Sequence, residues 1–199
     1  MTVPVSRQGG HASRANVPGS GEHATQRTEG GVCPTPMTWE TLQAIVADGS
    51  LASMQALGRS QETLRRYHEF KARISEFYAS IEDKIMIDVF NCDWKVNEDR
   101  KIVHVPSSPG SSSGGSSGSS PPSQSSPIFV QNDFPYNLAS GIEHYLLWSD
   151  RAMSNDEVEA YLHTHPIARQ SSAWLTFVNP LQLQSIPDIH HVHVLLKMR

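Results

Sequence analysis

The sequence predicts an α+β fold, in which N-terminal helices pack on a mostly antiparallel sheet. In the first half of the chain, apolar residues recur at steps of three and four, the spacing of a helix with one buried face. In the second half, short β-branched and aromatic runs are separated by turn residues, as in strands joined by hairpins. Helices first and a mostly antiparallel sheet afterwards give an α+β domain.

Composition divides the chain into one domain and two segments without a core. Residues 1–36 are rich in Gly, Ser, Pro, Thr and His and lack aliphatic clusters, so we expect a disordered tail. Residues 107–126 contain only Ser, Gly, Pro and Gln, the composition of a flexible insertion. The remainder of residues 37–199 is long enough for a single α+β domain.

Charge and cysteine content exclude several classes of function. The net charge of −4 provides no basic face, so neither nucleic acid nor an anionic membrane is an expected partner. Cys33 and Cys92 lack CxxC spacing, and we expect no disulfide framework, no cysteine zinc site and no cofactor. No apolar run reaches membrane-spanning length and the N-terminus lacks a signal peptide's apolar core. These features favour the cytoplasm or the nucleus.

Two helices, with a short apolar segment between them, are expected before the insertion. Thr38 is a suitable N-cap for the first, which Gly49 ends, and a short apolar segment follows at 51–57. Ser60 is a suitable N-cap for the longest helix. We expect that helix to pack an apolar stripe on the core, made of Leu64, Tyr67, Phe70, Ile74, Phe77 or Tyr78, Ile81, Ile85 and Val89.

The second half of the chain supplies the sheet and one more helix. Ser154 and Glu157 have capping-box spacing, which predicts a helix that runs to about His163, before Pro166. Residues 102–105, just before the insertion, carry a weaker strand signal. The predicted strands are 102–105, 128–130, 142–148, 172–178 and 191–196.

The last of these strands contains the candidate functional histidines. Side chains alternate along a strand, so His191 and His193 share one face while Val192 and Val194 face a core. Spacing alone leaves three interpretations open: a nucleophilic pair, a structural pair, or two ligands of a metal site. A metal site would need further ligands from His144, Glu143, His190 or Asp188.

Several multi-residue motifs occur in an order that resembles a known fungal family. These are Asn132-Asp-Phe-Pro-Tyr136, Gly141-Ile-Glu-His-Tyr-Leu-Leu-Trp148, Phe177-Val-Asn-Pro180, Gln184-Ser-Ile-Pro187 and His191-Val-His-Val-Leu195. Together they resemble the uncharacterised domain of fungal N-acetylglucosamine-induced proteins, from about residue 37 onward. The resemblance implies a response to an amino sugar, with no established reaction.

More distantly, the same order resembles the histidine-triad nucleotide hydrolases and transferases, which are also α+β proteins. This resemblance implies that His191 attacks the α-phosphate and that His193 matches the last triad histidine. Asn179 would lie near the ribose and phosphate, and Ser185 would donate to phosphate oxygens. Gln184, Asn132 and His144, which stand in the shared motifs, complete the expected ligand contacts, with no metal.

Two departures from the triad pattern leave catalysis open. Ile189 stands where the first triad histidine is expected, and His190 is an additional histidine on the opposite face. The first hypothesis is therefore a protein that binds a nucleotide or nucleotide-sugar phosphate, with or without cleavage. The alternative is a non-catalytic regulatory or interaction protein of the amino-sugar response, whose histidine strand is structural.

Overall fold

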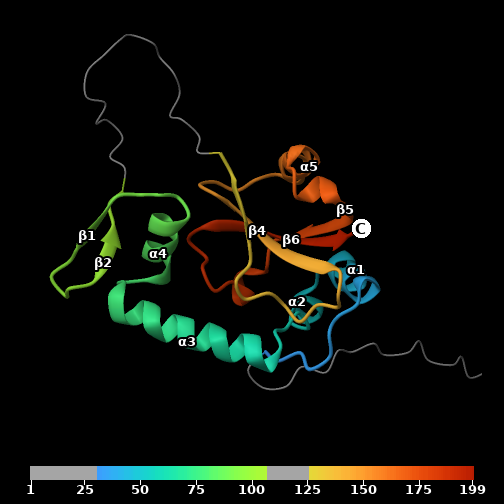
Figure 1. The fold of residues 1–199 in the computed structure, drawn as a ribbon, viewed down its shortest axis with the longest axis horizontal. Helices are drawn as coiled ribbons and strands as arrows, with labels where there is room; N and C mark the ends of the chain where they lie inside the picture. The colour runs from blue at the N-terminus through green and yellow to red at the C-terminus, as the bar shows by residue number, and fades with distance from the viewer. Residues whose placement is uncertain (1–30, 107–125) are drawn as a thin grey trace, which may run out of the picture.

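The computed structural model describes residues 31–106 and 126–199 (Figure 1). The expected α+β class is confirmed. The helices are α1 (Trp39–Asp48), α2 (Leu51–Met54), α3 (Gln61–Phe77), α4 (Ile81–Asp88) and α5 (Asn155–Thr164), with short 3-10 turns at Ala168–Gln170 and Leu181–Leu183. The strands are β1 (Trp94–Val96), β2 (Ile102–His104), β3 (Ile128–Gln131), β4 (Ile142–Ser149), β5 (Ser171–Phe177) and β6 (His190–Met198).

The main sheet places β6 in its interior. Its four strands are antiparallel in the order β3-β4-β6-β5, so β6 is hydrogen-bonded on both sides. The register sets Trp148 of β4 opposite His191 and Leu146 opposite His193. Both expected strands of the 128–148 hairpin form and pair as β3 and β4.

Within residues 31–106 and 126–199, three hydrophobic cores cover the two faces of the sheet. Helix α5 packs on one face, where Val192 and Val194 of β6 meet Leu162. The opposite face is covered at one end by α1 and α2, which pack around Leu195. At its other end, helix α4 packs around Trp148 and Ile189. Figure 1 shows α5 on one side of the sheet and α1, α2 and α3 on the other.

The expected helix ends form as the capping residues predict. Thr38 and Ser60 accept hydrogen bonds from backbone N–H groups in the first turns of α1 and α3. Ser154 and Glu157 make a complete capping box at α5. Gly49 ends α1 with a φ of 63°, a left-handed conformation in which glycine is favoured. Of the helices in the described residues, none has the length and apolarity needed to cross a membrane.

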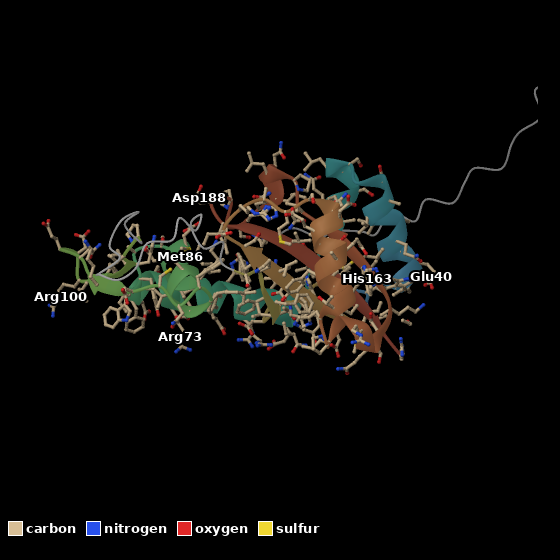
Figure 2. All side chains as sticks on the ribbon, turned by 90° about the horizontal axis from the view of Figure 1, so that it is seen from above. Glu40, Arg73, Met86, Arg100, His163 and Asp188 are labelled. Carbon is tan, nitrogen blue, oxygen red and sulfur yellow. The ribbon has the colours of Figure 1, made fainter. Side chains whose placement is uncertain are left out.

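The expected long helix is in fact two helices. It ends at Phe77, because the Ala79 N–H donates to the carbonyl of Ile102 in β2 instead of continuing the helix. Ser80 then caps α4 by accepting from the Asp83 N–H. Strand β1, which was not predicted, pairs with β2 in a separate two-stranded sheet. Figure 2 shows Arg100 of this hairpin at the opposite end of the molecule from Glu40 of α1.

The structure also differs from the expected tail over residues 31–36. Cys33 is 2% exposed, and its N–H donates to the Arg59 carbonyl at 2.7 Å. The Arg59 N–H donates in turn to the Gly31 carbonyl at 3.1 Å. Most of the predicted tail (1–30) and nearly all of the predicted insertion (107–125) lie outside the described residues.

We expect Gly58→Ala to destabilise the protein. A Cβ at this position would lie 2.7 Å from the Gly31 carbonyl oxygen and 3.0 Å from the Cys33 backbone nitrogen, so backbone would have to move. Overpacking of this kind costs about 1–3 kcal/mol, which urea denaturation would measure. Lys95→Ala, at an exposed site of β1, is the control. Equal unfolding midpoints for Gly58→Ala and the wild type would contradict the prediction.

Candidate functional site

A cavity opens between α3, α4 and the main sheet. Its volume is about 300 Å³, which falls in the range of small-molecule sites. It lies on the β6 face that carries His191 and His193, between the core around Leu195 and the core around Ile189. The two histidines therefore occupy the stretch of this face that neither core fills.

His191 presents one defined nitrogen to a ligand. The side chain is 8% exposed and lines the cavity, and its ring lies against Trp148 with centroids 4.7 Å apart. Nδ1 is 2.8 Å from the Ile189 carbonyl oxygen, which can only accept, so Nδ1 carries the proton. Nε2 therefore holds the lone pair, and no hydrogen bond within the described residues occupies it.

His193 uses both of its ring nitrogens within the protein. Nδ1 lies 2.9 Å from His144 Nε2, and Nε2 lies 3.1 Å from the side-chain amide of Asn179. The same amide is 3.1 Å from the Tyr136 hydroxyl. The ring also stacks on Phe177 at a centroid distance of 5.0 Å. His193 is thus fixed in position, and His191 is the histidine whose ring nitrogen is available to accept a hydrogen bond from a ligand.

His144, His193 and Asn179 form a chain of hydrogen bonds, whose direction is set by a backbone N–H that can only donate. The Tyr136 backbone N–H lies 3.3 Å from His144 Nδ1, so this nitrogen is an acceptor. The His144 proton then sits on Nε2 and is donated to His193 Nδ1. His193 carries its own proton on Nε2, and a half-turn of the Asn179 amide presents oxygen to it. All three groups are neutral in this arrangement.

Burial keeps the imidazoles uncharged. The pKa of His144 is lowered to about 3, first by burial and then by the positive charge of Arg59. The pKa of His193 is lowered well below its usual value, mainly by burial, with His144, His191 and Arg59 adding to the effect. Burial also lowers the pKa of His191. At neutral pH the His191 lone pair is therefore available.

Arg59 brings a positive charge to the cavity. Its Nε donates to the Phe134 carbonyl at 2.9 Å, and its guanidinium lies 4.5 Å from the centroid of the Tyr67 ring. Among the described residues no carboxylate forms an ion pair with it. Its backbone is held on both sides by the 31–33 segment. An arginine fixed in this way is suited to bind an anion such as phosphate.

The structure brings most of the expected site residues together. Asn179, Ser185 and Asn132 line the cavity with His191 and His193. Asn132 also accepts the Phe134 N–H through its side-chain oxygen, at 2.9 Å, which shapes the cavity wall.

Two of the expected ligand contacts lie outside the cavity lining. His144 is 2% exposed and touches the site through His193. Gln184 donates to the Asn179 carbonyl at 2.7 Å and lines a neighbouring depression. Each of these side chains supports a residue that does line the cavity.

The two residues that depart from the expected triad pattern, Ile189 and His190, both have structural roles. The Ile189 side chain is buried in the core under α4, while its carbonyl orients His191. His190 turns away and accepts the Met153 N–H at 3.3 Å. Within the described residues no group of three His, Cys, Asp or Glu side chains is arranged to hold a metal ion.

Sequence reasoning missed the contribution of the N-terminal half to this site. Arg59, Lys84 and Asp88 line the cavity but stand in no motif. Tyr67 and Phe70 line it too, although their spacing predicted a core stripe. One available signal was Arg59 itself, a basic residue between Gly58 and the helix cap Ser60. Its partners are distant in sequence, so the pattern alone does not reveal its role.

Stability should fall as the pH is lowered. Below about pH 6.5, a histidine whose pKa is lowered by folding stays neutral in the folded protein but takes up a proton in the unfolded chain. The free energy of unfolding is therefore highest above about pH 6.5 and decreases as the pH falls below it. Each such histidine contributes a slope of about 1.4 kcal/mol per pH unit. For His144 the decline continues toward its folded pKa of about 3. We expect His144→Gln to reduce the slope, as measured by urea denaturation from pH 7.5 to 4.5.

His163→Gln is the matched control, because the His163 side chain is 69% exposed on α5. It removes a histidine from the surface and not from the buried hydrogen-bonded group, so the slope should change less than in His144→Gln. A wild-type slope in His144→Gln would show that His144 does not take up its proton on unfolding.

Comparison with known proteins places the chain in a family. It is 30% identical over 175 residues to the uncharacterized protein YPL067C of Saccharomyces cerevisiae, covering 79% of this chain and 77% of that protein. It is 27% identical over 182 residues to N-acetylglucosamine-induced protein 1 of Candida albicans, covering 81% and 68% respectively. The crystal structure of HTC1 matches with a TM-score of 0.54 and 27% identity, covering 81% of this chain and 85% of that one. Residues 38–197 match the family described as Protein of unknown function (DUF3605), and the chain therefore belongs to that family.

Proposed function

We propose that this protein binds a nucleotide or nucleotide-sugar phosphate, with the phosphate between His191 and Arg59. One observation carries the proposal: the same cavity contains the lone pair of His191 Nε2 and the charge of Arg59, which no carboxylate of the described residues pairs with. A guanidinium supplies charge-assisted hydrogen bonds to phosphate oxygens. Ser185, an exposed hydroxyl in the lining, supplies a further donor. The distant resemblance to histidine-triad proteins supports the same ligand class.

The geometry also supports phosphoryl chemistry at His191. Its Nε2 lone pair forms an N–P bond while the bond from phosphorus to the leaving group breaks, and the leaving group takes the electron pair and a proton from water. A second water then attacks phosphorus, and the electron pair of the breaking N–P bond returns to Nε2, which frees the neutral imidazole and releases the phosphate monoester. The proton lost by this second water neutralises the hydroxide that the first water left. Arg59 stabilises the charge on the phosphoryl oxygens throughout.

A binding protein without turnover is the second candidate. Ile189 favours it, because an apolar side chain stands where a triad histidine would act. The Candida relative is named for induction by N-acetylglucosamine, which suits a regulatory role in the amino-sugar response. Both candidates share the cavity and differ only in the fate of the ligand.

Binding should depend on Arg59. We expect AMP or UDP-N-acetylglucosamine, at a hundred times its dissociation constant, to stabilise the wild type by about 2.7 kcal/mol. Arg59→Gln should weaken binding by about 10- to 100-fold, because a hydrogen bond from a charged group contributes about 1.5–3 kcal/mol. Urea denaturation with and without ligand measures the stabilisation, and isothermal titration calorimetry measures the dissociation constants. Arg66→Gln, at an exposed position of α3, should bind as the wild type does. No binding of either ligand would overturn the proposal.

Turnover should depend on His191. With adenosine 5′-phosphoramidate as substrate, release of AMP by His191→Ala should fall about a thousandfold or more, because the nucleophile is gone. His190→Ala changes the adjacent histidine on the opposite face and should retain the wild-type rate. Circular dichroism of both variants reports folding. Wild-type protein that binds AMP but releases none from the phosphoramidate would favour the binding protein.

A further inference from the structure

Three aromatic side chains in the lining of the cavity form a cluster of their own. Phe134 lies 5.4 Å from the Tyr67 ring and 4.8 Å from the Phe70 ring, measured between centroids. All three rings line the cavity, and each is only half-buried. None of them belongs to the three hydrophobic cores of the described residues. The fold therefore exposes large apolar rings at this position without using them for core packing.

Helix α3 shows why these rings remain available. Its apolar stripe has the spacing of a core-facing helix, yet only Ile74 of the helix is buried. Tyr67 and Phe70 instead face the cavity, across from Phe134 of the 132–136 segment. Figure 1 shows α3 running along one side of the molecule, from α2 to α4. Tyr67 and Phe70 of this stripe thus form part of one wall of the cavity.

Arg59 joins this aromatic end of the cavity to the histidine end. Its guanidinium lies over Tyr67 and is bonded to the Phe134 carbonyl. Its charge also acts on the buried histidines, since it contributes to the lowered pKa of His193. One cavity therefore contains the two histidines and the aromatic cluster, and Arg59 is part of the same lining.

Polar groups stand beside the aromatic end. Lys84 and Asp88, one turn apart on α4, form an ion pair and line the cavity. The Lys84 ammonium lies 5.8 Å from the centroid of the Phe70 ring. An ammonium and a carboxylate offer a donor and an acceptor to the edge of a planar heterocycle that stacks on the rings. A purely aliphatic ligand group would leave both unused.

We propose that Tyr67, Phe70 and Phe134 form a subsite for the nucleobase of the ligand, with Lys84 and Asp88 at the edge of the base. The inference rests on the proposed function, because Arg59 and His191 hold the phosphate of the same molecule. It goes further by naming the group that the ligand carries beside the phosphate. Bases stack on aromatic side chains with little dependence on sequence, so this subsite accepts purines and pyrimidines.

The test compares ligands that share a phosphate and differ in the base. Isothermal titration calorimetry gives dissociation constants for AMP, UMP and ribose 5-phosphate. We expect the wild type to bind AMP about tenfold or more tightly than ribose 5-phosphate, the contribution of one stacked base. Phe70→Ala should bring AMP close to ribose 5-phosphate and leave the affinity for ribose 5-phosphate unchanged.

Phe77→Ala is the matched control, since Phe77 is on the same helix, is 56% exposed and lies outside the cavity lining. It should retain the wild-type preference for AMP. Phe70→Leu keeps apolar volume without an aromatic ring and should lose most of the preference, which provides a second variant should Phe70→Ala fold poorly.

The outcomes separate the two proposals. Equal affinities of the wild type for AMP and ribose 5-phosphate, or an undiminished preference in both Phe70 variants, would overturn the nucleobase subsite and leave phosphate binding intact. Absence of binding by all three ligands would overturn the phosphate site and the subsite together. A preference that is lost with Phe70 and kept with Phe77→Ala supports the subsite.

Discussion

The alternation of side chains along β6 is the constraint on which the site depends. Because β6 is hydrogen-bonded to β4 and β5, its register is fixed on both edges. Val192 and Val194 must then face α5, and His191 and His193 must face the opposite side. A slip of one residue would exchange these sets and bury the histidines under α5. The same packing that stabilises the sheet therefore also positions the imidazoles.

A chain of neutral hydrogen-bonding groups makes this burial tolerable. Tyr136, His144, His193 and Asn179 satisfy one another, so none of these imidazole nitrogens is left without a partner in a region of low polarity. Replacing one of these side chains would leave its neighbour with an unsatisfied hydrogen-bonding group. His144 therefore supports the site although it does not line the cavity. His191 differs, because a backbone carbonyl holds one nitrogen and leaves the other for a ligand. These side chains hold His193 in place, whereas His191 lines the cavity with a ring nitrogen that has no hydrogen-bond partner within the described residues.

Local patterns allowed most of the elements to be predicted from the sequence, whereas the cavity required the tertiary structure. The caps at Thr38, Ser60 and Ser154 act within one turn, so they are visible in the sequence. The end of α3 depends on a hydrogen bond between Ala79 and Ile102, which no local pattern encodes. Arg59 likewise acquires its role from Phe134 and Tyr67. An apolar helix stripe does not reveal whether it meets a core or an opening, and α3 meets an opening.

The position of β6 also determines the order in which the protein can assemble. Its neighbours β4 and β5 both precede it in the sequence and do not pair with each other. During synthesis β4 and β5 cannot become part of the same sheet until β6, which lies between them, has been made. Such long-range pairing slows folding, because chain entropy is lost before the contacts form. Arg59, Tyr67 and Phe70 are made well before β6, and β3 can pair with β4 without it. His191 and His193 are consequently the part of the cavity that joins the rest only when β6 enters between β4 and β5.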